Sequence, residues 1–341
     1  MFLTTEERRE GIGGTDVGAI MGANPYRSPI ACWKDKLGQM PPVELNHAME
    51  WGNLLEDVIG KKYADNNNLF FQGEYDGSNA FPDYPSEYNG VIFKPLTVRH
   101  RDYSWAYAHP DFYVWNGKWK WGEHTGIEVK TISEGIYKKY WAEGDIPPWQ
   151  YYQVLWYSIV TRIMKWVVVG FAPHLRLSKD PLLTHEIHID PDEQARVMKK
   201  VNYFWECVTN KVEPELDEYT EQDIRLLYPE SNADIVSSST YIDKIVKRLF
   251  TVRQQLKPLT EEEDKLKNEI KAYMKQAGRL IGEDGSELAT FKNSKSRVTV
   301  DYKNICEELR PLVDPQTYGK VEHLNTKAVV SARRFLLKYK E

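Results

Sequence analysis

The spacing of hydrophobic residues separates helix-like from strand-like segments over the first 210 residues. Met49, Leu55, Ile59 and Tyr63 recur at roughly helical spacing, which predicts an amphipathic helix over residues 47–66. The same reasoning predicts helices at 149–162 and 192–210, strands at 91–100, 104–108, 165–171 and 183–189, and a surface excursion at 70–88, where Gly, Asn, Asp and Pro gather.

Residues 111–130 are typical of a β-hairpin that ends in an acidic and basic pair. Asn116-Gly117 lies between alternating aromatic and polar residues, and both central positions of a type I′ turn need positive φ. Glu128 and Lys130 stand two apart on the second strand, so their side chains should share one face, with Asp111 leading the first strand beside them. Two carboxylates beside an ammonium suit a hard divalent cation, Mg²⁺ or Mn²⁺, although such a pair is more often simply solvated.

A second apolar pattern lies in the C-terminal third. Hydrophobic residues three and four apart over residues 241–276 predict one long helix, or a helical hairpin hinged at Pro258. Residues 283–286 read as a turn between short strands. The Pro- and acid-rich residues before this part predict a linker at 216–238 between a domain at 1–215 and an extension at 239–341.

Charge is distributed unevenly along the chain. The net charge is −5, but residues 231–341 hold 21 Lys/Arg against 16 Asp/Glu, whereas residues 1–230 hold 24 against 34. The basic extension could bind a polyanion, or it could be a solvated helix with scattered lysines. The three cysteines are far apart and form no CxxC pair, which argues against a zinc ribbon, a four-cysteine cluster or disulfides. The N-terminus lacks a signal-peptide core and no apolar run is long enough to span a membrane, so a cytoplasmic protein is expected.

A glycine-rich stretch at residues 11–22 predicts a turn that leads into a short helix. Thr15 can cap this helix, and the following backbone N–H groups would then face any bound anion. The spacing is not that of the dinucleotide fingerprint, since no strand precedes it. The alternative is that the glycines only turn the chain.

Four separated motifs together resemble the YqaJ family of viral recombinases, relatives of the phage lambda exonuclease within the PD-(D/E)xK nuclease superfamily. In chain order they are Gly11-Ile12-Gly13-Gly14-Thr15-Asp16, Trp51-Gly52 with Glu56, Pro110-Asp111 followed by Glu128-Val129-Lys130, and Pro147 with Gln153. The nuclease pattern covers residues 5–210, and residues 240–341, including the stretch 296–301, look like the extension of many members. The resemblance implies an α/β restriction-endonuclease-like core, a central mixed sheet flanked by helices, with a smaller C-terminal α+β or helical extension.

The resemblance also implies an acidic metal site. Asp111 and Glu128 match the family's metal-binding carboxylates, with the backbone carbonyl of Val129 as a further ligand. Lys130 matches the catalytic lysine. Glu56 matches the helical glutamate that completes the site, directly or through water. One or two Mg²⁺ ions are expected, and Mn²⁺ could replace them.

Three further positions follow from the resemblance. Gln153 matches the glutamine of the helix after the core sheet. Arg8 and Thr15 are the counterparts of residues that hold the DNA 5′-phosphate in lambda-type enzymes, with threonine in place of the commoner serine. Gln150 stands where many members have tyrosine.

The implied function is that of a Mg²⁺-dependent deoxyribonuclease, foremost a 5′→3′ exonuclease on double-stranded DNA in phage-type homologous recombination. A single-strand annealing protein as partner, a trimeric or other ring-shaped homo-oligomer, and the host cytoplasm for a phage-encoded chain are expected with it. The alternatives are a structure-specific endonuclease, a non-catalytic DNA-binding or recombination accessory protein, and an interaction protein whose main part is residues 240–341. The non-catalytic alternative is disfavoured because Asp111, Glu128 and Lys130 are all present.

Overall fold

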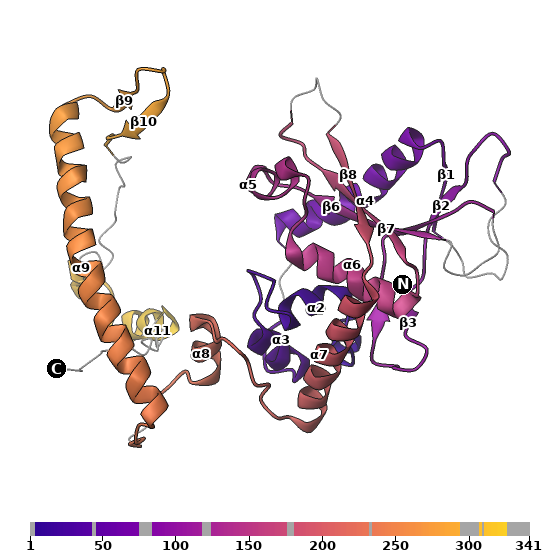
Figure 1. The fold of residues 1–341 in the computed structure, drawn as a ribbon. Helices are drawn as coiled ribbons and strands as arrows, with labels where there is room; N and C mark the ends of the chain where they lie inside the picture. Colours follow the sequence, from indigo (N-terminus) through magenta and orange to yellow (C-terminus); the bar gives the residue numbers. More distant parts are fainter. Residues whose placement is uncertain are drawn as a thin grey trace. The chain divides into compact units, whose positions relative to one another are not determined.

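A computed structural model describes residues 4–42, 46–74, 84–117, 124–175, 181–231, 234–293, 307–308 and 310–325. The chain forms two compact units, Met1–Tyr228 and Pro229–Glu341 (Figure 1). The lysine- and tryptophan-rich start of the predicted second hairpin strand, residues 118–121, and the stretch 296–301 lie outside the described residues.

The first unit is built on a six-stranded mixed sheet with the strand order β1-β2-β5-β6-β7-β8 (Figure 1). The strands β1–β2 and β6–β7 run parallel, and the other three neighbouring pairs run antiparallel. The sheet strands are β1 (Phe70–Glu74), β2 (Val91–Lys94), β5 (Phe112–Trp115), β6 (Thr125–Thr131), β7 (Lys165–Phe171) and β8 (Leu182–His188). A separate antiparallel pair consists of β3 (Val98–Arg99) and β4 (Tyr107–Ala108).

Helices cover both faces of this sheet. Ile59 and Ala64 of α4 (His47–Asn66) pack with Ile127 and Val167 on one face. The other face carries a larger core that includes Trp156 and Trp166. This second layer contains α2 (Gly14–Ile20), α3 (Pro29–Lys36), α6 (Pro148–Thr161) and α7 (Pro191–Asn210). Shorter elements are α1 (Thr5–Arg9), α5 (Glu134–Lys139), η1 (Trp141–Glu143) and α8 (Glu221–Leu227). The predicted fold class, a mixed sheet flanked by helices, is confirmed.

Four local predictions for the first unit differ from the structure. Asn116-Gly117 does not form the centre of a type I′ turn, because Asn116 lacks a positive φ and the register pairs Val114 with Thr125. Residues 70–74 of the expected surface excursion form β1, an edge strand that pairs in parallel with β2. The helix α8 lies within the span predicted as a linker, and Leu226 accepts a hydrogen bond of 2.5 Å from Lys34 Nζ through its carbonyl. Thr15 does not cap α2: Gly13 is the N-cap residue, its N–H donates to Asp16 Oδ2 (2.9 Å), and Thr15 is exposed.

A buried ion-pair cluster holds α2 and α3 together, and no sequence pattern indicated it. Asp16 accepts hydrogen bonds from Arg27 Nη1 (2.8 Å) and from Lys36 Nζ (2.7 Å), whose side chain is almost fully buried. Arg27 also contacts Asp35 Oδ2 at 2.5 Å. Burial acts to raise the pKa of Asp16, but the charges of Lys36 and Arg27 outweigh it and leave that pKa below its ordinary value.

Asp16→Asn is therefore expected to lower the free energy of unfolding by about 3–5 kcal/mol at neutral pH, because Lys36 loses its buried counter-charge. Because folding lowers the pKa of Asp16, its ionised carboxylate stabilises the protein at pH values above its ordinary pKa of about 3.9. This stabilisation is lost as pH falls through the lower pKa that Asp16 has in the folded protein. The difference between wild type and variant should shrink in the same acidic range. Denaturant unfolding at several pH values measures it, with the exposed Asp65→Asn on α4 as control; an equal loss for both variants would contradict the role of the cluster.

The second unit is dominated by one helix, α9 (Thr240–Met274), 35 residues long. It runs through Pro258 without interruption, so the long-helix prediction is confirmed and the hairpin alternative is wrong. β9 (Arg279–Ile281) and β10 (Glu287–Thr290) form the expected antiparallel pair, followed by η2 (Arg310–Leu312) and α11 (Pro315–Asn325). Among the described residues, no helix combines the length and apolar character needed to cross a membrane.

Candidate active site

The antiparallel pairing of β5 with β6 brings the Asp111, Glu128 and Lys130 side chains together. Asp111 precedes β5 directly, and its Oδ2 accepts the Val129 N–H at 2.7 Å. Lys130 Nζ lies 2.5 Å from Glu128 Oε1, which confirms that the two side chains share a face of β6. The register places Phe112 opposite Ile127, so the hydrophobic residues between the charged ones turn toward α4. Strand alternation thus buries the apolar residues on one side and collects the charges on the other.

Gln153 of α6 closes this cluster from the helical layer. Its Nε2 donates to Glu128 Oε1 (2.6 Å) and lies 2.8 Å from the hydroxyl of Tyr157, one helical turn later. The Tyr157 hydroxyl in turn donates to the His109 carbonyl at 3.2 Å. Hydrogen bonds therefore connect the segment before Asp111 to Glu128 through α6. Sequence reasoning identified Gln153 but missed Tyr157, although the i, i+4 spacing of the two residues on one helix was available.

The electrostatics of the cluster favour a bound cation. Burial, together with the charges of Glu128 and Glu56, raises the pKa of Asp111 well above its ordinary value. Burial also raises the pKa of Glu128, against the opposing charge of Lys130. Burial alone would lower the pKa of Lys130, but Glu128 and Asp111 outweigh it and raise that pKa, so the amine keeps its proton. An additional positive charge would relieve the repulsion among the carboxylates.

Glu56 does not join the cluster by a direct contact. It lies on α4, and its Oε1 pairs with Lys94 Nζ of β2 at 2.9 Å, while the same amine contacts Asp57 Oδ1 at 2.7 Å. Its charge still acts on Asp111 and Glu128. Lys94, which the sequence did not indicate, therefore holds Glu56 on the α4 side of the sheet.

Two of the predicted ligands suit a hard divalent cation. Among the described residues, no donor reaches the buried Glu128 Oε2, and a carboxylate oxygen of this kind is normally satisfied by a donor or a metal ion. Asp111 lies beside it and is half-buried. Within the described residues, no group of three or more His, Cys, Asp and Glu side chains is arranged to hold an ion. The acidic trio is incomplete because Glu56 is turned to Lys94.

Arg8 and Thr15, the predicted phosphate-binding residues, belong to helices near this cluster. In the described part of the chain, they do not form a pocket together with it. Arg8 is exposed at the end of α1, and its charge lowers the pKa of His109, after the larger effect of burial and the opposing charge of Glu56. Thr15 is exposed in the first turn of α2. At its neighbour Gly14, a Cβ atom would lie 2.5 Å from the Tyr157 ring and 2.9 Å from Gln153 Cγ, so this glycine is needed for α2 to pack against α6. The glycine motif thus has a packing role beside the candidate site.

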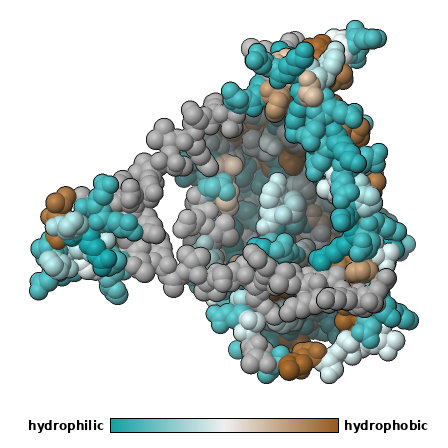
Figure 2. All heavy atoms as spheres, turned by 90° about the vertical axis from the view of Figure 1, so that its left-hand side faces the viewer, coloured by the Kyte–Doolittle hydropathy of each residue, from teal (hydrophilic) through white to brown (hydrophobic). Residues whose placement is uncertain are grey.

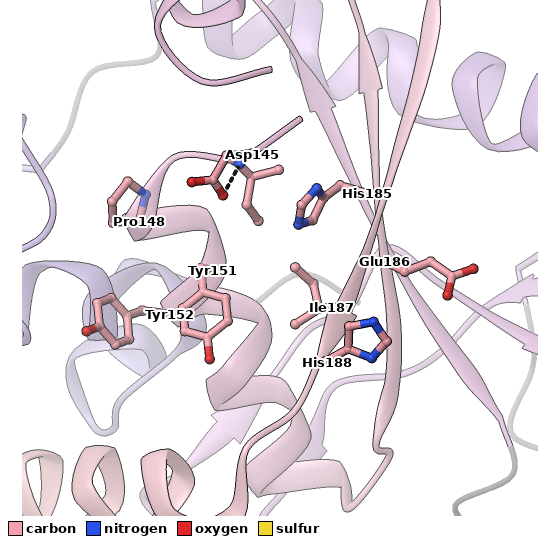
Figure 3. A pocket seen from close by; sticks show the side chains of 9 residues that line it. Asp145, Pro148, Tyr151, Tyr152, His185, Glu186, Ile187 and His188 are labelled. Carbon is pink, nitrogen blue, oxygen red and sulfur yellow. Dashed lines mark hydrogen bonds between the residues drawn. The ribbon is translucent and has the colours of Figure 1, made fainter. Parts of the chain in front are cut away.

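Two further features of α6 are Gln150, at the position where many family members have tyrosine, and a pocket lined in part by this helix. Gln150 is buried, with 7% of its surface exposed. Figure 3 shows a pocket between α6 and β8, with Tyr151 facing His185 and Ile187 across it and Glu186 directed away. None of the predicted catalytic residues lines this pocket. The hydrogen-bonded carboxylates, rather than this pocket, define the candidate active site.

Comparisons with known proteins identified one similar protein sequence, several similar structures and one family model. The uncharacterized protein YqaJ of Bacillus subtilis (strain 168) is 26% identical over 328 residues, which cover 93% of this chain and 89% of that protein. Two solved structures are more distant: the alkaline exonuclease LHK-Exo from Laribacter hongkongensis (16% identity, 60% of this chain and 90% of that one, TM-score 0.45) and a phage-related exonuclease from Haemophilus somnus 129PT (13%, 59% and 96%, TM-score 0.40). The family model described as the YqaJ-like viral recombinase domain matches residues 5–163, the part that carries all four motifs. Residues 5–163 therefore resemble the YqaJ-like viral recombinase domain, and the YqaJ protein is similar over most of this chain.

Proposed function

We propose that this protein is a Mg²⁺-dependent deoxyribonuclease that degrades double-stranded DNA from its ends in the 5′→3′ direction during phage-type recombination. The single observation that carries the proposal is the joined set of Asp111, Glu128 and Lys130, with a buried and unpartnered oxygen on Glu128. The resemblance to the YqaJ-like viral recombinase domain supports a nuclease, and the two similar solved proteins are named as exonucleases.

Each side chain of the set has a distinct role in this proposal. Asp111 and Glu128 would hold Mg²⁺, with the Val129 carbonyl as a further ligand and Glu56 contributing once it leaves Lys94. A bound Mg²⁺ lowers the pKa of a water and neutralises charge on the phosphate. Lys130 remains protonated and donates toward the attacking water or the phosphate oxygens, while Gln153 fixes the orientation of Glu128.

The proposed partners follow from the same reaction. Digestion of one strand from its 5′ end leaves a 3′ single strand, which a single-strand annealing protein would bind. We further propose that the enzyme acts as a homo-oligomer, ring-shaped in the manner of its family, in the cytoplasm of the host. Linear and covalently closed circular duplexes distinguish the modes of action: an exonuclease degrades only the linear form, whereas loss of the closed circle would indicate an endonuclease.

Glu56→Gln is expected to raise the Mg²⁺ concentration needed for half-maximal activity by about 10-fold, because it removes one negative charge from the site. Asp57→Asn is the matched control, since Asp57 contacts the same Lys94 but is 63% exposed and has no role in the proposed site. Titration of Mg²⁺ in a duplex-digestion assay measures both variants. Unchanged Mg²⁺ dependence in Glu56→Gln would make Glu56 a structural residue of α4.

Arg8→Ala is expected to reduce the preference for 5′-phosphorylated duplexes roughly tenfold, because a charge-assisted contact to the doubly charged terminal phosphate is lost. The assay compares initial rates on duplexes with and without a 5′-phosphate. Arg101→Ala, at another exposed arginine, should leave the preference intact. Equal wild-type rates on both substrates would remove the 5′-phosphate site from the proposal.

A further inference from the structure

The helix α9 carries a strict seven-residue repeat of apolar positions. Successive members are alternately three and four residues apart from Ile242 to Tyr273. The positions are Ile242, Ile245, Leu249, Val252, Leu256, Leu259, Glu263, Leu266, Ile270 and Tyr273, with Glu263 the single polar member. A period of 3.5, sustained over more than four heptads, is the signature of a left-handed coiled coil rather than of a helix on a globular core.

Most of this seam is exposed among the described residues, and Leu249 and Val252 are half-buried. Leu256 is 54% exposed, Leu259 60% and Leu266 53%, and only Met274 among the residues of α9 is buried. Among the coloured residues in Figure 2, hydrophilic ones predominate and hydrophobic ones form separate patches. A long amphipathic helix gains most of its stability from packing its apolar face, so α9 requires a partner along its length.

The charges along α9 identify the partner. Residues 240–257 contain five Lys/Arg and one Asp, whereas residues 258–274 contain five Asp/Glu and three Lys. The two halves of the helix are therefore complementary to each other. A second copy of α9 satisfies this complementarity when it runs in the opposite direction.

We propose that α9 forms an antiparallel two-stranded coiled coil with α9 of a second copy of this chain. The two-fold axis passes between residues 257 and 258, so that Leu256 faces Leu259 and Ile245 faces Ile270 of the other copy. Arg248 then lies beside Glu269 of the second copy, and symmetry repeats this pair.

The parallel arrangement is less favourable. It places Glu263 against Glu263 in the seam and Arg248 beside Arg253, and like charges there destabilise the pair. Its one attractive pair, Glu262 with Lys267, does not offset both repulsions. The antiparallel arrangement instead sets Glu263 opposite Val252, and Glu263 already pairs with Lys267 at the edge of the seam (2.6 Å).

Pro258 is compatible with this seam. Pro258 follows Lys257, and both lie at outward-facing heptad positions between Leu256 and Leu259. The helix α9 remains continuous through the proline. The proline therefore removes one backbone hydrogen bond without placing its ring between the helices. This inference does not depend on the nuclease proposal, because it rests on α9 alone.

The mass of the full-length protein in solution, measured by sedimentation, tests the association. The wild type is expected to have an even number of subunits, either a dimer or two rings joined through α9, and Leu256→Glu with Leu259→Glu should halve its mass. A wild type with an odd number of subunits would overturn the proposal. Gln254→Glu with Asn268→Glu adds the same charge on the outer face of α9 and should leave the mass unchanged. A monomeric wild type, as expected if a different protein covers α9, or a seam variant of unchanged mass would overturn the proposal.

Disulfide trapping tests the relative direction of the two α9 helices. It does not require the variant Leu256→Glu with Leu259→Glu to fold. In a Cys306→Ser background, mixed Ile245→Cys and Ile270→Cys proteins should form a disulfide-linked heterodimer. Neither protein alone should form more than a trace of homodimer. Absence of the heterodimer, or efficient homodimers of Ile245→Cys alone, would overturn the antiparallel arrangement.

Discussion

Lys130→Ala is expected to lower the rate of duplex hydrolysis by about 10²–10⁴-fold, with DNA binding and Mg²⁺ binding largely retained. The Lys130 amine is protonated and held 2.5 Å from Glu128 Oε1, so it can donate to a water or a phosphate oxygen but cannot ligate a cation. Its removal takes away a donor that acts on the reacting groups and leaves the carboxylates in place. Initial rates on linear duplex, with binding measured separately in Ca²⁺, separate the two effects.

The control for this prediction is Lys138→Ala, which removes an exposed lysine of α5 that pairs with Glu134. Lys138 carries the same charge, so a general electrostatic effect on DNA binding would appear in both variants. Hydrolysis by Lys130→Ala at the wild-type rate would show that the active-site assignment is wrong.

Asp111→Asn should have opposite effects on activity and on stability. Activity is expected to fall by about 10²–10⁴-fold, because a metal-binding carboxylate is lost. Without metal, the variant should be more stable than wild type by about 1–2 kcal/mol at neutral pH, because a repelled charge is removed while the amide oxygen can still accept the Val129 N–H. The rise in melting temperature that Mg²⁺ gives the wild type should disappear.

The stability difference between Asp111→Asn and metal-free wild type should depend on pH. The pKa of Asp111 is raised by folding, so its contribution to stability is full below the ordinary value near 3.9 and is lost as pH rises through the folded pKa. The stability difference between variant and metal-free wild type should therefore grow with pH over that interval. Thermal unfolding with EDTA at several pH values measures it, and an Asn variant less stable than wild type at neutral pH would contradict the electrostatic account.

The central hairpin could be predicted because its information is local. The spacing of Glu128 and Lys130 fixes a shared face on any strand, and their contact confirms it. The turn signal at Asn116-Gly117 indicated the two strands but gave the wrong register, because Val114 pairs with Thr125 and not with a residue directly after the predicted turn. Gln153 was reached only through the family resemblance, and its bond to Glu128 bears out that it lies in the cluster.

Contacts between distant elements could not be predicted. Lys94 on β2 meets Glu56 on α4 only because the fold places this strand and helix together, and no periodicity relates the two residues. Thr15 is a good N-cap residue by type, but the carboxylate of Asp16 takes the Gly13 N–H, and a buried ion-pair cluster fixes that carboxylate. Pro258 suggested a hinge by its local preference, whereas an outward position on α9 tolerates it.

Digestion of linear duplexes labelled at the 5′ or the 3′ end, with Mg²⁺ or with EDTA, is the most direct test of the central claim. The account predicts release of label as mononucleotide from 5′-labelled ends at the earliest times, late release from 3′-labelled ends, and no release in EDTA or with Asp111→Asn. Undiminished digestion in EDTA, or no digestion of any duplex with Mg²⁺, would contradict metal-dependent hydrolysis at Asp111, Glu128 and Lys130.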